Sequence, residues 1–258
     1  MYYILILPRI ILRNIKGIFY DKNYNILDKK EIEKIILDKR NIGKNYIIKH
    51  TLETCGGKNV EKIRIEFEGI LYKDSFISFE ELLKKYEQNF IIQEVVKQSE
   101  FFNKINPNSL NTIRVMTYRD GEEYDLLSTT LRVGIGKGVV DNFSSGGFAI
   151  GVDKSNGKLN CYGINGKSEF IFEKPPNTGE IFADKLIPNW EKIVKTVEEW
   201  TKDIPAYFKI GAWDIGIDEN NEPIFIEVNL RCPDAEICQL VGPLFGAKTE
   251  YLLDKILN

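Results

Sequence analysis

Near the C-terminal end, two apolar runs with alternating polar positions flank a short polar stretch. The first run contains Asp214, the second spans 223–229, and residues 219–222 between them read Glu-Asn-Asn-Glu. Alternation with a period of two predicts strands, and the polar stretch predicts the turn of a hairpin. Side chains two residues apart on a strand point to the same face, so Glu227 and Asn229 point the same way. Asp214 can face them across the hairpin where the register allows.

The rest of the chain alternates between helical and strand-like patterns. Asp28 is placed as the N-cap of a first helix, and Ser78 with Glu81 forms a capping box that opens a second. The helical period of apolar positions predicts helices at 28–40, 79–88, 190–200 and 243–257. The strand-like runs predict strands at 45–50, 63–67, 90–96, 112–117, 126–133 and 149–153. The pattern therefore predicts an α+β fold.

Composition narrows the function classes. The chain has 258 residues and a formal net charge of −3, so it offers no basic stripe for nucleic acid. The cysteines form no Cys-x-x-Cys pair and His50 is the only histidine, which disfavours a Cys/His zinc site and nucleophile–histidine catalysis. The apolar run 2–12 is interrupted by Pro8 and is too short to span a membrane. Free thiols and the lack of a signal peptide predict a cytoplasmic protein.

The C-terminal hairpin carries a set of oxygen donors. Asp214, Glu227 and Asn229 supply two carboxylates and one amide oxygen. Such hard ligands suit Mg²⁺ that bridges the phosphates of a nucleotide. The alternative is an ordinary amphipathic hairpin with a charged face.

Earlier in the chain, a strand and the glycine-containing loop after it have the composition of a phosphate-binding site. Lys49 ends an apolar strand, and the loop that follows closes with Gly56, Gly57 and Lys58. A lysine beside glycine-exposed backbone amides can hold phosphate oxygens. A lysine before a plain turn is the alternative.

The strand at 90–96 can supply the contacts that an adenine base needs. Gln93, Glu94 and Val96 lie at its end, where a backbone carbonyl and a backbone N–H can pair with the base. Glu100 follows and can accept hydrogen bonds from ribose hydroxyls. An exposed helix glutamate is the alternative for Glu100.

Two arginines occupy neighbouring apolar strands. Arg114 and Arg132 are costly there unless each is paired with an acid or bound to an anion. Both alternatives, a phosphate contact and a structural ion pair, stay open. Asn142 lies in the polar loop 141–147, whose amides can hold an anion or an acyl phosphate, unless this is a plain hairpin loop.

The order of these features resembles the ATP-grasp superfamily over residues 45–243. The strings Asn-Thr-Ile-Arg at 111–114, Leu-Arg-Val-Gly at 131–134 and Trp-Asp at 213–214, with the 141–147 loop, are similar to the sugar-transfer-associated ATP-grasp family. The resemblance implies two α+β lobes that grip Mg-ATP.

The resemblance also implies a division of the chain. Residues 45–98 would form the small lobe and residues 99–258 the large lobe with the metal site. Residues 1–44 would be a short or truncated N-terminal lobe, in which Lys16 is the nearest counterpart of a further nucleotide-facing lysine.

The implied chemistry is ATP-dependent joining of a carboxylate to an amine through an acyl phosphate. ATP and Mg²⁺ are the implied cofactors, and an amino acid, a nucleotide sugar or a uronic acid of bacterial surface polysaccharide synthesis are the implied small-molecule substrates. Arg132, Arg231 and Asn142 would act on the reacting groups, and Arg114 would contact the nucleotide or the acyl phosphate. The alternatives are an ATP-grasp kinase that phosphorylates a hydroxyl and a non-catalytic nucleotide-binding scaffold. The apolar run 2–12 is also a candidate surface for a homodimer.

Overall fold

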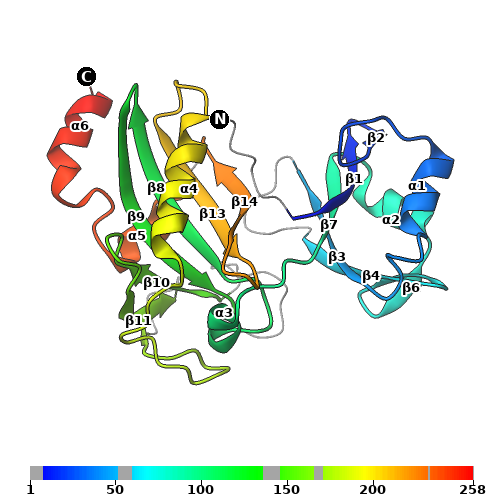
Figure 1. The fold of residues 1–258 in the computed structure, drawn as a ribbon, viewed down its shortest axis with the longest axis horizontal. Helices are drawn as coiled ribbons and strands as arrows, with labels where there is room; N and C mark the ends of the chain where they lie inside the picture. Colours follow the sequence, from blue (N-terminus) through cyan, green and yellow to red (C-terminus); the bar gives the residue numbers. More distant parts are fainter. Residues whose placement is uncertain (1–7, 52–59, 136–145, 166–170, 232, 258) are drawn as a thin grey trace. The chain divides into compact units, whose positions relative to one another are not determined.

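The computed structural model describes residues 8–51, 60–135, 146–165, 171–231 and 233–257. The chain divides into two compact units, an N-terminal unit at Leu7–Val96 and a C-terminal unit at Lys97–Asn258. Both units combine an antiparallel sheet with helices (Figure 1). The predicted α+β class is therefore confirmed.

The N-terminal unit is built on one seven-stranded sheet with the order β2-β1-β7-β3-β4-β5-β6. Its strands are β1 (Ile10–Ile15), β2 (Ile18–Tyr20), β3 (Asn45–His50), β4 (Glu61–Glu66), β5 (Gly69–Tyr72), β6 (Ser75–Ile77) and β7 (Phe90–Glu94). The first two strands join this sheet because β1 pairs along β7. Residues 10–20 therefore complete the same sheet as residues 45–94, where the sequence suggested a separate segment at 1–44.

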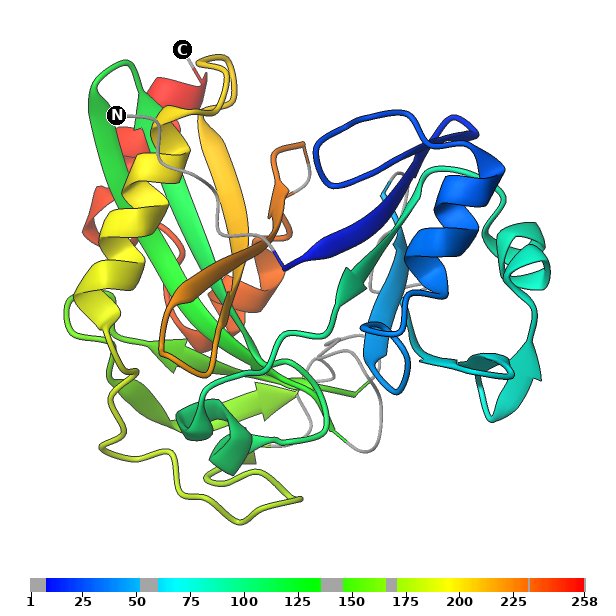
Figure 2. The same cartoon turned by 45° about the vertical axis from the view of Figure 1, so that its right-hand side comes forward.

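Helices α1 (Lys29–Ile36) and α2 (Phe79–Tyr86) cover this sheet with their apolar faces (Figure 2). Ile32 and Ile36 of α1 and Leu82 of α2 are buried in one cluster with the sheet. The capping boxes predicted at both helix starts are present, with Asp28 and Ser78 each accepting a hydrogen bond from the backbone three residues on. Local signals thus determine where these helices begin.

The C-terminal unit has a second seven-stranded sheet, with the order β12-β11-β10-β9-β8-β13-β14. Its strands are β8 (Thr112–Asp120), β9 (Glu123–Val133), β10 (Phe148–Val152), β11 (Leu159–Asn165), β12 (Ile171–Phe172), β13 (Ile210–Ile217) and β14 (Pro223–Asn229). Its helices are α3 (Glu100–Ile105), α4 (Trp190–Lys202), α5 (Glu236–Val241), the 3₁₀ turn η2 (Gly246–Lys248) and α6 (Thr249–Leu257).

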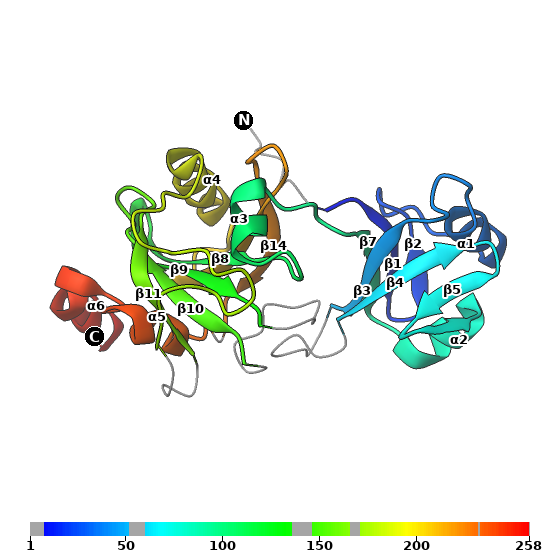
Figure 3. The same cartoon turned by 90° about the horizontal axis from the view of Figure 1, so that it is seen from below.

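The two faces of this sheet are covered differently. Helix α4 lies on one face, and α5 and α6 lie on the other (Figure 3). Trp190, Val197 and Trp200 of α4 are part of the larger apolar cluster, whereas Cys238 of α5 and Leu252 of α6 belong to a smaller one. Within the described residues, no helix is both long enough and apolar enough to span a membrane.

One turn of the C-terminal unit requires glycine. Gly157 has φ +77°, and a Cβ there would lie 2.6 Å from the Trp190 ring. Gly157→Ala is expected to lower the free energy of unfolding by about 2–4 kcal/mol, because left-handed backbone strain adds to overpacking. Gly179→Ala is the matched control, since Gly179 has φ +72° and a Cβ there would meet nothing within 4 Å. Equal losses in the two variants, measured by urea unfolding, would contradict the predicted clash.

Candidate functional site

A row of polar side chains crosses four adjacent strands of the C-terminal sheet. Glu227 on β14 is directly opposite Asp214 on β13, which is opposite Arg114 on β8, which is opposite Thr130 on β9. Residues that lie directly opposite each other on antiparallel strands project to the same face. Asn229 lies two residues beyond Glu227 and projects to that face as well. The hairpin register therefore lets Asp214 face Glu227.

Asp214 is the centre of a buried ion cluster. Its Oδ1 accepts a hydrogen bond of 2.8 Å from Arg114 Nε, and its Oδ2 accepts one of 2.8 Å from Arg114 Nη2. Arg132 Nη1 donates a further hydrogen bond of 2.9 Å to the same Oδ2. The side chains of Arg114 and Asp214 are only 4% and 3% exposed, and that of Arg132 is 12% exposed. This two-pronged geometry is the arrangement in which guanidinium and carboxylate pair most strongly.

The cluster keeps Asp214 ionised. Burial is the largest influence on the pKa of Asp214 and by itself raises it. The charge of Arg132 and the hydrogen bonds from Arg114 together outweigh burial, and they lower the pKa of Asp214 from 3.8 to about 2. Burial likewise acts most strongly on Arg114, where it lowers the pKa, but the pairing with Asp214 raises that pKa above its usual value.

Arg114 also connects the cluster to the segment before α5. Its Nη1 donates a hydrogen bond of 3.4 Å to Oδ2 of Asp234. All three guanidinium nitrogens of Arg114 are thus directed at acids, so Arg114 forms a structural ion pair, one of the two alternatives for this residue. Its contact with the nucleotide or the acyl phosphate stays a prediction. Arg231 is exposed, and the nearby Asp234 bonds to Arg114.

The donor set of the hairpin fits a divalent cation. The carboxyl groups of Asp214 and Glu227 are within hydrogen-bonding reach of each other, and Asn229 Nδ2 lies 3.5 Å from Glu227 Oε1. Two neighbouring carboxylates and an amide oxygen on one face match the ligands that Mg²⁺ prefers. A carboxylate oxygen has two lone pairs, so Oδ1 of Asp214 retains one beside its bond to Arg114. Among the described residues no group of three His, Cys, Asp or Glu side chains could hold a metal, so the amide of Asn229 is needed to complete this set.

The N-terminal unit holds the candidates for the nucleotide. Lys49 is at the end of β3, where it is opposite Ile91 on β7. Gln93 is buried in the middle of the sheet, and Glu94 ends β7 with its Oε1 accepting a hydrogen bond of 2.8 Å from Arg9 Nη1. Arg9 is a partner that the sequence did not reveal, because it precedes its strand without a recognisable motif.

Several candidates have no described site geometry. Val96 follows the end of β7 and is half-buried. Glu100 opens α3 in the C-terminal unit, where it forms an ion pair of 3.0 Å with Lys104, as the exposed-glutamate alternative predicted. The remaining candidates lie outside the described residues; they are Gly56, Gly57, Lys58 and Asn142.

A buried amide network lies at the base of the cluster's strands. Asn111 is fully buried at the start of β8, and its Nδ2 donates to Gln98 Oε1, 2.9 Å away. Asn106 Nδ2 donates to Ser109 Oγ at 2.9 Å and to the carbonyl of Gly134 at 3.1 Å. The network holds the segments before β8 and after β9 together. Sequence reasoning missed it, although Asn111 stands in the string that ends at Arg114.

Comparisons with known proteins agree with this architecture. The family model described as sugar-transfer associated ATP-grasp matches residues 6–246. No curated protein matches the chain significantly in sequence.

The solved structures that resemble this chain do so at low sequence identity. An N5-carboxyaminoimidazole synthetase from Staphylococcus aureus in complex with ADP is 12% identical, with a TM-score of 0.45 over 87% of this chain and 41% of that one. The biotin carboxylase domain of the Hydrogenobacter thermophilus 2-oxoglutarate carboxylase, crystallised with MgADP, is 15% identical, with a TM-score of 0.45 over 91% and 39%. The D-cycloserine synthetase DcsG is 11% identical, with a TM-score of 0.39 over 94% and 59%.

This chain thus spans only 39% to 59% of the length of these three proteins. The family match, in contrast, runs through nearly the whole chain, from the first strand of the N-terminal unit to the 3₁₀ turn before α6. The chain therefore belongs to the sugar-transfer associated ATP-grasp family.

Proposed function

We propose that this protein is an ATP-dependent carboxylate–amine ligase that activates its carboxylate substrate as an acyl phosphate. The observation that carries the proposal is the polar row on the C-terminal sheet, in which Glu227 and Asp214 lie side by side with two guanidinium groups behind them. The row combines an oxygen donor set with fixed positive charge. Phosphoryl transfer depends on these two features, because its transition state spreads negative charge over phosphate oxygens.

The chemistry of the donor set assigns roles to the residues of the row. Asp214, Glu227 and Asn229 would hold Mg²⁺, which when bound neutralises the charge of the nucleotide phosphates. Arg114 holds the Asp214 carboxylate by two hydrogen bonds, so that its orientation is set before any ligand arrives. Arg132 makes one hydrogen bond to Asp214 and is three times as exposed as Arg114, so it is the guanidinium that we assign to the transferred phosphoryl group or the acyl phosphate.

The N-terminal unit would supply the nucleotide contacts. Lys49 places a positive charge for phosphate oxygens at the end of β3, and the backbone at Glu94 and Val96 would pair with the adenine base. Membership of an ATP-grasp family supports ATP as the nucleotide. Arg231 and Asn142 remain proposed contacts to the reacting groups.

The family description supports our proposal for the substrate class. A role in sugar transfer suits an amino acid joined to a uronic acid, or a nucleotide sugar whose amino group is acylated, in bacterial surface polysaccharide synthesis. We place the reaction in the cytoplasm, which suits the free cysteines Cys161 and Cys238. The proposed homodimer contact at residues 2–12 falls mostly outside the described residues.

The deciding experiment is a trapping assay with the full chain, Mg-ATP, hydroxylamine and a panel of amino acids and uronic acids. A ligase that forms an acyl phosphate releases inorganic phosphate and produces a hydroxamate with its own carboxylate substrate. A kinase keeps the phosphoryl group on the product and gives neither. Mg-ADP binding by calorimetry without turnover of any substrate would favour a nucleotide-binding scaffold.

Lys49→Ala is expected to weaken binding of Mg-ADP by about 1–3 kcal/mol, because a hydrogen bond from an ammonium group to a phosphate oxygen is lost. Calorimetry on both proteins measures the difference. Lys62→Ala is the matched control, since Lys62 is an exposed lysine on the neighbouring strand β4 of the same sheet. Equal affinities of the Lys49 and Lys62 variants would remove Lys49 from the nucleotide site.

A further inference from the structure

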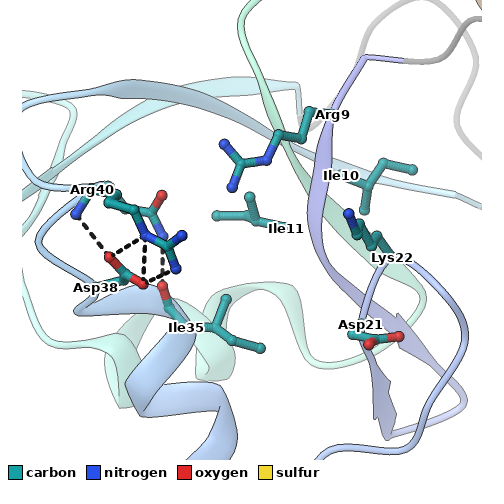
Figure 4. Close-up of a pocket in the computed structure, with 9 residues that line it drawn as sticks. Arg9, Ile10, Ile11, Asp21, Lys22, Ile35, Asp38 and Arg40 are labelled. Carbon is teal, nitrogen blue, oxygen red and sulfur yellow. Dashed lines mark hydrogen bonds and ion pairs between the residues drawn. The ribbon is translucent and has the colours of Figure 1, made fainter.

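The N-terminal unit contains a cavity that the proposed reaction does not use. It has a volume of about 200 Å³ and lies between β1, the loop after β2 and the segment after α1 (Figure 4). Its lining consists of Arg9, Ile10, Ile11, Asp21, Lys22, Ile35, Asp38, Arg40 and Asn41. All of these residues belong to the N-terminal unit, so the cavity is complete within it.

One wall of the cavity is the loop after β2, which is held by a buried arginine. Arg13 is 8% exposed, and its Nη1 donates hydrogen bonds of 2.9 Å to the carbonyls of Asp21 and Lys22. The Asp21 carboxylate in turn accepts hydrogen bonds from the backbone N–H groups of Asn23 and Asn25, at 2.8 and 2.9 Å. The loop is thus fixed by its own contacts.

The opposite wall is the turn after α1, and it is equally fixed. The Asp38 carboxylate accepts hydrogen bonds from the backbone and the guanidinium of Arg40, between 2.6 and 3.1 Å. Asn41 is buried, donates to the carbonyl of Ile35 at 2.6 Å and accepts from the Tyr46 hydroxyl at 2.9 Å. A cavity with two such walls is pre-formed, which lowers the entropic cost of binding a ligand.

The hydrogen-bonding capacity left in the cavity is cationic. Asp21 and Asp38 are both engaged within their own turns, and the bonds from Arg40 hold the pKa of Asp38 well below its usual value. Arg9 directs only Nη1 at Glu94, and Arg40 directs Nε and Nη2 at Asp38. Within the described part of the chain, neither Arg9 Nη2, Arg40 Nη1 nor Lys22 Nζ finds an acceptor. A guanidinium has five N–H donors, so both arginines can bind an oxyanion without losing their acids.

The apolar part of the lining distinguishes between oxyanions. Ile11 and Ile35 contribute hydrocarbon to the cavity, and Figure 4 shows their side chains beside the guanidinium groups of Arg9 and Arg40. Inorganic phosphate has no apolar group to place against the isoleucine side chains. A carboxylate with a short apolar chain covers these side chains and still reaches the arginines. The volume of about 200 Å³ suits a ligand of amino-acid size, since it is below the ~300 Å³ at which pockets for larger ligands begin.

We infer that this cavity is a binding site for a small carboxylate with a short apolar chain, held by Arg9, Lys22 and Arg40 over the isoleucine surface. The charge of the lining agrees with a monoanion. Three cations and two acids line the cavity, and Arg9 also pairs with Glu94 outside the lining, so the lining accommodates one added negative charge better than two. The inference does not depend on the proposed ligase reaction, because it concerns binding alone.

The test is methyl NMR of the full chain labelled at the isoleucine δ1 methyl groups, titrated with 3-methylbutanoate. Saturable shifts at Ile11 and Ile35 are expected, with no matching shifts when 3-methylbutan-1-ol or inorganic phosphate is added. Equal shifts with the alcohol would reduce the site to an apolar surface and overturn the inference. Shifts that follow phosphate in preference to the carboxylate would overturn it in favour of a phosphate site.

Variants of the exposed cations test the same assignment. The double variant Lys22→Gln and Arg40→Gln is expected to bind 3-methylbutanoate at least about tenfold more weakly, because two charge-assisted contacts are lost. Both side chains are exposed, so the fold is retained. Lys30→Gln on α1 is the control, since Lys30 is exposed and outside the lining. This variant should bind 3-methylbutanoate with the affinity of the wild type. Undiminished affinity in the double variant would overturn the inference.

Discussion

Asp214→Asn is expected to lower the free energy of unfolding by about 3–5 kcal/mol, because it leaves two guanidinium groups in a buried site without their counter-ion. The side chains of Arg114 and Arg132 are 4% and 12% exposed, so water cannot replace the lost carboxylate. The amide that replaces it also turns a donor toward a guanidinium, which has no acceptor to offer. Urea unfolding with EDTA present measures the loss.

Two controls separate the ion cluster from a general effect of losing an acid. Asp203→Asn removes an exposed carboxylate at the end of α4 and should change stability by less than about 0.5 kcal/mol. The double variant Arg114→Met and Asp214→Leu should lose less than the sum of its single variants, since partners removed together leave fewer buried charges unpaired. Additive losses would show that Arg114 and Asp214 do not depend on each other.

The loss of stability in Asp214→Asn should depend on pH, in a direction that follows from the pKa of Asp214. The folded-state pKa of Asp214 is lowered, so its carboxylate stabilises the fold fully above the unfolded value of 3.8 and loses this effect as the pH falls toward about 2. The stability difference between wild type and Asp214→Asn should therefore be largest above pH 4 and should shrink in more acidic solution. A difference that is constant from pH 6 to the acid limit of folding would contradict the lowered pKa.

Glu227→Gln is expected to lower kcat for Mg-ATP-dependent phosphate release by at least about 100-fold while leaving the fold intact. The substitution keeps the size of the side chain but removes one of the two negative charges proposed to hold Mg²⁺. Glu227 is exposed on strand β14, whereas Asp214 is buried, so we expect the substitution to leave the sheet folded. The prediction therefore assigns a functional loss without a loss of stability to Glu227, whereas Asp214, which is both a proposed Mg²⁺ ligand and the centre of the ion cluster, should lose both.

The readout must separate metal binding from catalysis. Binding of Mg²⁺ with ADP, followed by calorimetry, should weaken in Glu227→Gln, whereas ADP without Mg²⁺ should bind both proteins equally. Glu222→Gln is the matched control, because Glu222 precedes the same strand and pairs with Lys192 on α4. Full turnover and unchanged Mg²⁺ dependence in Glu227→Gln would exclude the hairpin as the metal site.

The two arginines illustrate how far residue types can be interpreted before the fold is known. An arginine in an apolar strand predicts a partner, and both arginines do have one, the same Asp214. Whether that partner is a protein acid or a ligand depends on which residue lies opposite, and the acid is 100 positions away from Arg114 in the chain. No local signal encodes such a pairing, because strand register is established by packing across the whole sheet.

The N-terminal strands likewise show that local sequence signals do not predict which strands pair. Residues 10–20 form β1 and β2, yet β7, the partner of β1, is about 80 residues further along, and nothing local links the two. The cavity described above follows from this pairing, since it lies between β1, the loop after β2 and the end of α1. Its cations are spread over residues 9–40 and form no motif.

The sequence by itself determined the local structure and the family of this protein. Capping residues and apolar periods placed the starts of α1 and α2 and the hairpin of β13 and β14, because these signals act within a few residues. The order of short strings identified the family. Only the tertiary structure decided that Asp214 faces Glu227 and binds two arginines, and that β1 completes the N-terminal sheet. These contacts join distant segments, and their geometry results from burying both sheets under their helices rather than from any local preference.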